Sequence, residues 1–259
     1  MWLFIETSLK RLINIDNMKK LIFVSTLILM IYGCSDDKTP KVDNNVYVGL
    51  ENTVKDFDGN LYNVIAIGKQ FWMKENLRTK NYTDGTPIPT GLNDDQWKCD
   101  TIGAYSVYDN NATNDSVFGK LYNWYAVADP RGLCPTGWHV PSDKDWNEMI
   151  KAIDPTANTF CSACTQSATA GGAMKEIKVS NWTSPNEGAS NSSGFSGLPG
   201  GCRDYDGTYL EIGSQGHWWT ATQASNLDAY YFYLDFNSSN INRLNYFKAN
   251  GQSVRCVKD

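Results

Sequence analysis

The amino-acid sequence predicts an α+β fold, and three observations support this. One segment near the middle of the chain has the periodicity of an amphipathic helix. Short apolar segments bounded by turn-forming residues lie on both sides of it and have the character of strands. Strands and helices do not alternate regularly, which argues against a series of βαβ units.

The first part of the folded region is predicted to be mostly β structure and loop. Residues 53–68 predict a hairpin, because the turn dipeptide Asp58-Gly59 separates two apolar stretches. Residues 69–77 begin with another short strand. Residues 82–100 are rich in turn formers and predict a surface loop. Residues 118–128 predict a short helix or turn, with a strand as the alternative.

Residues 131–146, RGLCPTGWHVPSDKDW, organise the chain around a turn and a helix start. Ser142 is the predicted N-cap, and Asp145 has the capping-box position three residues later. One helix face is then formed by Trp146, Met149, Ile150 and Ile153. We expect Trp138 to belong to the core, so that Trp138→Ala would cost on the order of 3–5 kcal/mol.

The second half is predicted to be a long loop followed by strands. Residues 170–177 predict a second short helix, and residues 181–201 consist almost entirely of turn formers. The remaining chain predicts strands over 207–212, 217–222, 230–236, 241–247 and 253–257.

The N-terminal region has the features of a bacterial lipoprotein signal. A basic start at Met18 precedes the apolar residues 21–32, a length that suits a signal-peptide core better than a membrane span. Gly33-Cys34 then resembles a lipobox, which predicts cleavage before Cys34 and its lipidation; an ordinary secretory signal is the alternative. The predicted organisation is 1–33 upstream extension and signal peptide, 34–52 lipidated tether, and 53–259 folded domain.

Acidic residues follow Cys34 directly and resemble a surface-export signal, so we expect an outer-membrane lipoprotein exposed at the cell surface. A periplasm-facing protein is the alternative. Loss of residues 1–33 removes four of the 23 basic and two of the 28 acidic residues, which leaves a net charge of −7. That charge argues against nucleic acid as a partner.

Six cysteines remain besides Cys34, and an even number in an exported chain predicts disulfides, at least two in number. Six cysteines allow fifteen pairings, among which spacing does not choose. Cys161 and Cys164 form a CxxC motif. A local structural disulfide is the favoured interpretation, and a redox pair or half a metal site are the alternatives.

An ordered series of motifs runs from Thr53 to Lys258. The motifs are Asp58-Gly59, Tyr62, Ile67-Gly68, Gln70-Phe71-Trp72-Met73, Asn76-Leu77, Tyr122-Asn123-Trp124, Gly132-Leu133-Cys134-Pro135, Gly137-Trp138-His139-Val140-Pro141-Ser142, Gly194-Phe195-Ser196-Gly197-Leu198-Pro199-Gly200-Gly201, Trp218-Trp219-Thr220-Ala221-Thr222 and Ser253-Val254-Arg255-Cys256-Val257. In this order they resemble the Fibrobacter succinogenes major paralogous domain.

The resemblance implies a C-type-lectin-like domain, related to the formylglycine-generating-enzyme fold, with short mixed strands, one main helix and long irregular loops. It also implies a Cys134–Cys256 disulfide, since both residues lie within family motifs. It leaves the pairing of the other four cysteines open.

The main functional expectation is a non-enzymatic binding or adhesion module for a carbohydrate, another cell-envelope component or a surface protein. The candidate ligand residues are Trp182, Asn186, Glu187, Asn191, Arg203, Asp204 and Asp206. Trp182 could stack on a sugar ring, and Asn186 and Glu187 could offer oxygens to calcium. For each residue, a purely structural role is the alternative.

Two other functions are considered. An oxidase like the formylglycine-generating enzymes would need a cysteine pair such as Cys202 and Cys256, but both are better explained as disulfide halves. His139 and His217 lack the partners of a catalytic triad or metal site in the sequence and are expected to be structural. We therefore expect no enzyme activity. A structural subunit of a surface appendage is the third possibility.

Overall fold

The computed structural model describes residues 52–178 and 180–259. Cys34, the predicted signal peptide and all but the last residue of the predicted tether lie outside the described residues. Lipidation at Cys34 and the domain boundaries therefore stay predictions. None of the helices in the described part of the chain has the length and hydropathy needed to cross a membrane.

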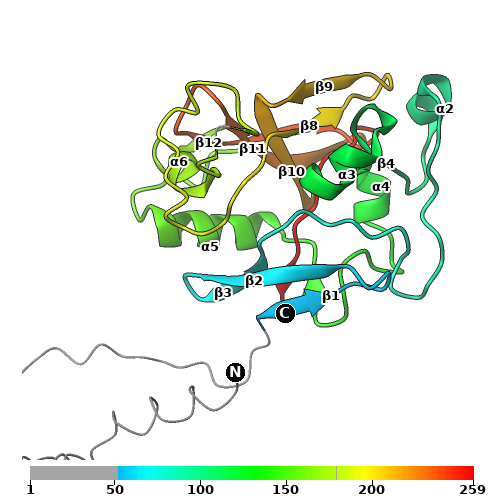
Figure 1. Ribbon diagram of the computed structural model, residues 1–259, viewed down its shortest axis with the longest axis horizontal. Coiled ribbons are helices and arrows are strands. Elements are labelled where there is room, and N and C mark those ends of the chain that lie inside the picture. The colour runs from blue at the N-terminus through cyan, green and yellow to red at the C-terminus, as the bar shows by residue number, and fades with distance from the viewer. Residues whose placement is uncertain (1–51, 179) are drawn as a thin grey trace, which may run out of the picture. The chain divides into compact units, whose positions relative to one another are not determined.

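Two main sheets form the domain (Figure 1). The smaller has the order β1-β2-β3-β13-β6, with β1 Thr53–Lys55, β2 Leu61–Ile67, β3 Gln70–Met73, β13 Val257–Lys258 and β6 Trp138–His139. The larger has the order β7-β12-β11-β10-β8-β9, with β7 Cys164–Ser167, β12 Ile241–Phe247, β11 Asp228–Asp235, β10 Gln215–Gln223, β8 Gly200–Arg203 and β9 Tyr209–Ile212. A third, two-stranded sheet pairs β4 Tyr105–Ser106 with β5 Leu121–Tyr122.

The helices are short, and the architecture is α+β. Those of the described residues are α2 Asp94–Cys99, η2 Tyr108–Asn110, α3 Ala112–Phe118, α4 Trp124–Val127, α5 Asp143–Ile153 and α6 Ala170–Met174. In Figure 1, α5 crosses the domain between the two main sheets. Strands at both ends and the main helix near the middle agree with the sequence prediction.

Helix α5 begins where the sequence predicts. The Ser142 side chain accepts a hydrogen bond from the Asp145 N–H, and the Asp145 carboxylate accepts one from the Ser142 N–H, which completes a capping box. Trp146, fully buried on the inner face of the helix, stacks on Phe232 of β11 at 4.8 Å between ring centroids and lies edge-on to Trp72 of β3 at 5.3 Å. One indole therefore joins the helix to both main sheets.

The large sheet presents two different faces. Trp218 of β10 is paired in register with Phe232 of β11, and both belong to the buried cluster around α5. The neighbouring pair, His217 and Tyr233, has its side chains on the opposite face. This second face is only partly covered by core residues, and it carries the cavity described below.

A disulfide joins Cys134 to Cys256 across 122 residues of sequence, with an S–S distance of 2.03 Å. This is the pair that the family resemblance implies. It fixes the turn before α5 to the C-terminal segment. Because β13 lies between β3 and β6, that segment also closes the smaller sheet.

The predicted loop over residues 82–100 is wrong in its last part, since α2 occupies Asp94–Cys99. Asn93 and Gln96 form a capping box there, and Trp97 is buried. Propensity alone did not reveal this helix, because a helix of six residues gains most of its stability from tertiary packing. The segment 118–128 contains both predicted alternatives, strand β5 followed by helix α4.

Trp146→Ala is expected to lower the free energy of unfolding by about 3–5 kcal/mol, because it empties a fully buried site between two sheets. Trp138 is only partly buried, at the edge of the core, so Trp138→Ala should cost less than half of that amount. Urea unfolding of both variants measures the difference. Equal costs would contradict the burial that separates the two indoles.

Asp154 is expected to make stability depend on pH in the acid range. Hydrogen bonds from the Ser167 hydroxyl, and then from Thr156, lower its pKa from 3.8 to about 2 in the folded protein. The carboxylate thus stabilises the fold above pH 3.8, and this contribution is lost as the pH falls through about 2. Comparing urea unfolding of wild type and Asp154→Asn should show a gap at pH 6 that closes by pH 2. A gap that is constant with pH would contradict this assignment.

Candidate functional site

A cavity of about 270 Å³ lies on the partly covered face of the large sheet. We call it the sheet cavity. Five strands and the segment before β13 contribute its lining, which consists of Cys202, Asp204, Leu210, Glu211, Gln215, His217, Tyr231, Tyr233, Leu244, Tyr246, Asn250 and Gln252. None of these twelve residues is a lysine or an arginine.

The strands position the aromatic wall of the cavity. His217 stacks almost parallel to Tyr231, with ring centroids 5.5 Å apart and an interplanar angle of 7°. Tyr233 lies 5.9 Å from the same imidazole at 25°. Both tyrosines come from β11 at a spacing of two, so the pleat places them on the same face as His217. The imidazole plane is therefore fixed by packing.

His217 also has two polar neighbours in the cavity. Its Nε2 lies 2.9 Å from Glu211 Oε2 and 3.0 Å from Gln215 Oε1. The hydrogen bond from His217 is the largest cause that lowers the pKa of Glu211, and partial burial opposes it. Glu211 has φ +69°, a left-handed conformation that is uncommon for a residue of this type. The carboxylate is thus held beside the imidazole at some backbone cost.

Cys202 is a buried free thiol at the same place. Burial raises its pKa to about 12, and the negative charges of Glu211 and Asp204 act in the same direction. The thiol is therefore protonated at neutral pH and a weak nucleophile. The Cys202 sulfur, one Glu211 oxygen and one His217 nitrogen lie within 4.8 Å of one another, so these three residues could hold a metal ion.

The cavity also contains buried polar atoms that are incompletely satisfied. Asn250 donates a hydrogen bond to the Asp204 carboxylate at 3.0 Å. Asn250 Oδ1, Gln252 Oε1 and His217 Nδ1 have no hydrogen-bond partner among the described residues. The three side chains are only 2%, 1% and 6% exposed, respectively. Buried polar atoms without partners are costly, and they mark a place where a polar ligand would be favourable.

A largely aromatic surface adjoins the sheet cavity. We call it the aromatic surface and define it by Tyr205, Leu227, Tyr246 and Phe247. These side chains are 38%, 68%, 39% and 43% exposed. The Tyr205 and Tyr246 rings lie 5.2 and 5.5 Å from Phe247, respectively. Tyr246 belongs to both features, because it also lines the cavity.

The structure assigns Trp182 to the core. Its side chain is 2% exposed, and its indole N–H donates to the Gly197 carbonyl at 3.0 Å. The prediction that a sugar ring stacks on Trp182 is therefore wrong, because the indole is not accessible. Trp182 has the structural role that was the alternative. Asn191 likewise has an internal role, since both ends of its amide bond to Ser196.

The proposed calcium ligands lie around a buried lysine. The Lys175 ammonium donates to the carbonyls of Glu187, Asp235 and Ser238 at 2.7–2.9 Å. Asn186 donates to the Glu176 carbonyl and is itself buried. An ammonium thus occupies the point on which the loop carbonyls converge. The Lys175 side chain therefore supplies a positive charge at the place where calcium was predicted from Asn186 and Glu187.

The three remaining candidates separate into different roles. Arg203 is buried and donates to the carbonyls of Gly207 and Leu92 and to the carboxylate of Asp94, so it holds the β8–β9 turn to α2. Asp206 accepts two bonds from Thr208 within that turn. Asp204 alone among the predicted ligand residues lines the sheet cavity.

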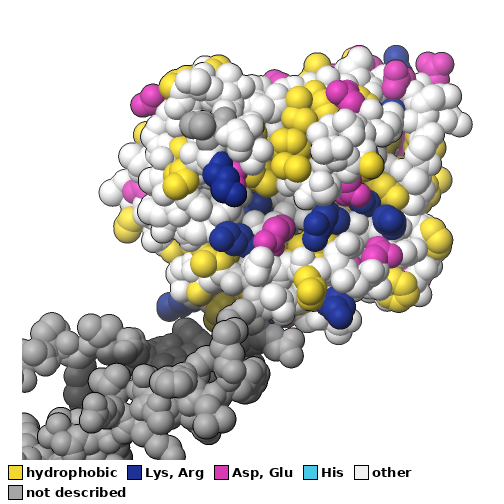
Figure 2. Space-filling view, viewed as in Figure 1, with side chains coloured by type: hydrophobic (Ala, Val, Ile, Leu, Met, Phe, Trp, Pro, Cys, Tyr) yellow, Lys and Arg dark blue, Asp and Glu magenta, His cyan; other side chains and the backbone are white. Residues whose placement is uncertain are grey.

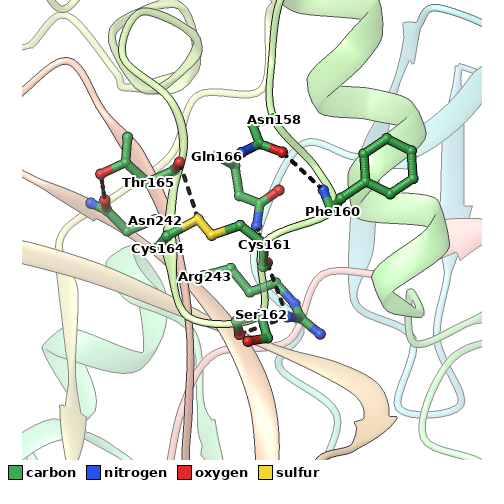
Figure 3. Close-up of a disulfide and its surroundings, with 9 residues drawn as sticks. All are labelled: Asn158, Phe160, Cys161, Ser162, Cys164, Thr165, Gln166, Asn242 and Arg243. Carbon is green, nitrogen blue, oxygen red and sulfur yellow. Dashed lines mark hydrogen bonds between the residues drawn. A yellow bond between two sulfur atoms is a disulfide. The ribbon is translucent and has the colours of Figure 1, made fainter.

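The cysteine assignment needs one correction. Cys256 is a disulfide half, but Cys202 is not, and Cys99 is also free. Cys161 and Cys164 are bonded to each other, as favoured from the sequence. Figure 3 shows this disulfide beside Arg243, which donates to the carbonyls of Cys161 and Ser162 and pairs with Asp143 of α5. The CxxC loop is therefore anchored as a structural element.

His139 is hydrogen-bonded, as expected, to the carboxylates of Asp259 and Asp145. Most residues of the sheet cavity, including Glu211, Tyr231, Tyr246 and Gln252, were not predicted from the sequence. Part of the cavity could have been found from the sequence. Gln215 and His217 are two residues apart in one strand, as are Tyr231 and Tyr233 in the next, and this spacing places the side chains of each pair on one face of the sheet. The strand order that joins them is not visible in the sequence.

Lys175→Met should lower the free energy of unfolding by at least about 2 kcal/mol, because three carbonyls lose their buried donor. Lys178→Met is the matched control, since Lys178 is 74% exposed, and it should change stability by less than about 0.5 kcal/mol. Urea unfolding of the two variants and of the wild type measures both effects. Equal effects of the two substitutions would contradict this role.

Comparison with known proteins gives one match. Residues 65–258 match the family model described as the Fibrobacter succinogenes major domain. No curated protein and no solved structure matches the chain. The matched region covers β3 to β13, the whole larger sheet, and every residue that lines the sheet cavity. The chain therefore belongs to the Fibrobacter succinogenes major domain family.

Proposed function

We propose that this protein is a non-enzymatic binding module of the bacterial cell surface, with a saccharide of the cell envelope or of an external polysaccharide as its ligand. The observation that carries the proposal is the sheet cavity with its adjoining aromatic surface. The domain is proposed to have a C-type-lectin-like architecture, in which strands hold a ligand site rigid.

The lining supports a saccharide because it combines ring faces with polar groups. Tyr231, Tyr233 and Tyr246 offer aromatic area. Asp204, Asn250 and Gln252 offer the carboxylate and amide groups that hydroxyls can bond. A volume of about 270 Å³ suits one sugar unit, and the exposed rings beside it could contact the next.

The charge of the domain is consistent with an uncharged or weakly charged ligand. Basic and acidic side chains lie mixed across the face shown in Figure 2, without a large basic area. The net charge of −7 for residues 34–259 likewise argues against nucleic acid as a partner.

The sequence signals at the N-terminus supply the proposed location. Lipidation of Cys34 would anchor the domain to the outer membrane, and residues 34–52 would tether it. Exposure at the cell surface is proposed from the acidic residues after Cys34, with a periplasm-facing orientation as the alternative.

An oxidase that uses paired cysteines is disfavoured by the chemistry of the site. Cys256 is covalently bonded to Cys134, so it is not available as the thiol partner of Cys202. The raised pKa of Cys202 keeps that thiol protonated.

A glycan and polysaccharide array tests the proposal directly. The full chain should bind a defined set of saccharides, and Tyr246→Ala should weaken that binding at least about tenfold, since it removes a ring shared by cavity and surface. Phe160→Ala is the matched control, because Phe160 is 92% exposed on the CxxC loop, and it should leave binding unchanged.

The array is run in three conditions: with calcium, after treatment with a chelator, and after calcium or zinc has been added back to the chelated protein. Binding that needs calcium would relocate the site to the loop around Asn186 and Glu187. No binding by the wild type, or equal losses in both variants, would overturn the proposal.

A structural role in a surface appendage is the second candidate, and the exposed Leu227 and Phe247 favour it. Apolar side chains grouped on a surface can serve as a contact between proteins. Sedimentation of the full chain distinguishes the two: self-association that is lost in Leu227→Ser would support assembly, and a concentration-independent monomer would exclude self-assembly through this surface.

A further inference from the structure

The three residues Cys202, Glu211 and His217 differ from every other group of acidic, cysteine and histidine side chains in the described part of the chain. They are the one set of at least three whose ligand atoms all lie within 4.8 Å of one another. Cys202 and His217 are buried, and Glu211 is partly exposed. The set combines a sulfur, a nitrogen and an oxygen ligand on three neighbouring strands, β8, β9 and β10.

We infer that Cys202, Glu211 and His217 form a binding site for a divalent transition-metal ion, with zinc as the best-fitting one. The Cys202 thiol would release its proton to solvent on binding the ion, as cysteine ligands do. Thiolate and imidazole ligands select zinc and other soft or borderline cations over calcium and magnesium. Three protein ligands leave a fourth tetrahedral position open to a water or another small ligand. Ligand atoms around tetrahedral zinc lie about 3.5 Å apart. The three ligand atoms here lie within 4.8 Å of one another, with His217 Nε2 and Glu211 Oε2 at 2.9 Å, so side-chain adjustments on the order of 1 Å would bring all three to one ion.

The buried polar atoms of the cavity provide an independent observation for this site. The His217 side chain is only 6% exposed, yet its Nδ1 has no hydrogen-bond partner among the described residues. Asn250 Oδ1 and Gln252 Oε1, on the same cavity, are acceptors without donors. Because His217 Nε2 lies 2.9 Å from Glu211 Oε2, an ion shared by these two residues would be held by Nε2. A water bound to that ion would supply donors for the amide oxygens.

The electrostatics of the cavity also favour a cation. Its lining includes the carboxyl groups of Asp204 and Glu211 and no basic side chain besides His217. The nearest arginine in sequence, Arg203, directs its guanidinium to Asp94 and to the Gly207 and Leu92 carbonyls. The two carboxyl groups are therefore not neutralised by a fixed positive charge in the lining, and a divalent ion would neutralise them.

Backbone geometry adds a third indication. Glu211 has φ +69° at the end of β9, next to the turn that leads to β10. A glutamate has no intrinsic preference for this conformation, whereas glycine adopts it readily. The strained position presents the carboxylate to His217, which is consistent with a ligand role.

This metal site lies inside the proposed saccharide cavity but does not rest on the proposed function. It is tested with zinc and cobalt alone, without any saccharide. A protein that binds zinc but no glycan, or the reverse, would therefore separate the two proposals.

The experiment uses the full chain, purified without an affinity tag and carrying Cys34→Ser and Cys99→Ser, so that Cys202 is the remaining free cysteine. Zinc titration is expected to show one high-affinity site and a raised melting temperature. Cobalt should give a thiolate-to-cobalt charge-transfer band with intensified visible bands. Zinc should also protect Cys202 from alkylation.

Cys202→Ser and His217→Gln should each weaken zinc binding at least about a hundredfold and abolish the cobalt charge-transfer band or change its visible bands. Glu211→Gln should weaken binding while retaining the charge-transfer band. His139→Gln is the matched control, because it changes the other histidine of the chain and should bind zinc like the parent.

Circular dichroism and melting without zinc establish that each variant is folded. If Cys202→Ser does not fold, alkylation protection in the parent protein and cobalt spectra of His217→Gln carry the test. No stoichiometric zinc binding by the parent, or zinc affinity that His139→Gln lowers as much as His217→Gln, would overturn the inference.

Discussion

The hydrogen bonds of one buried guanidinium group, that of Arg255, are the interaction on which most of this fold depends. Arg255 is 0% exposed and donates to Asn76 Oδ1 at 2.9 Å through Nη2 and to the Phe195 carbonyl through Nη1. The same Asn76 oxygen accepts the Trp218 indole N–H at 2.8 Å. A buried charge is tolerated only when it is fully hydrogen-bonded. The residues after β3, the 181–201 loop, β10 and the C-terminal segment must therefore all be in place together.

The C-terminal segment transmits this constraint to the candidate site. Cys256, next to Arg255, is bonded to Cys134, which fixes the segment covalently. Just before it, Ser253 exchanges backbone hydrogen bonds with β10, and Gly251 does so with Arg203 of β8. The segment is thus held between β8 and β10, the strands that carry Cys202 and His217. The C-terminal segment therefore connects the Arg255 network to the two strands that carry these side chains.

The sheet cavity combines several unusual features in one place. Buried cationic groups such as Lys175 and Arg203 have several partners. Buried side-chain atoms without a partner occur in the cavity and also elsewhere among the described residues. In the cavity, a free buried thiol, a glutamate with positive φ and unpartnered amide oxygens occur together. Local rules are broken in native proteins mainly where function requires it. That concentration is the physical reason for placing both the ligand and the metal proposals here.

The sequence by itself determined the α+β class, the capping box of α5, most strands and the family, because these depend on local periodicity, cap spacing and motif order. It also indicated the local Cys161–Cys164 disulfide. Only the tertiary structure decided that Trp182 is core, that Lys175 holds the 186–191 loop and that Cys202 is free. The sheet order decided the site as well, since Glu211, His217 and Tyr246 meet only after β9, β10 and β12 are arranged around β8 and β11. Such contacts depend on strand order and face, which are set by the collective burial of side chains distant in sequence.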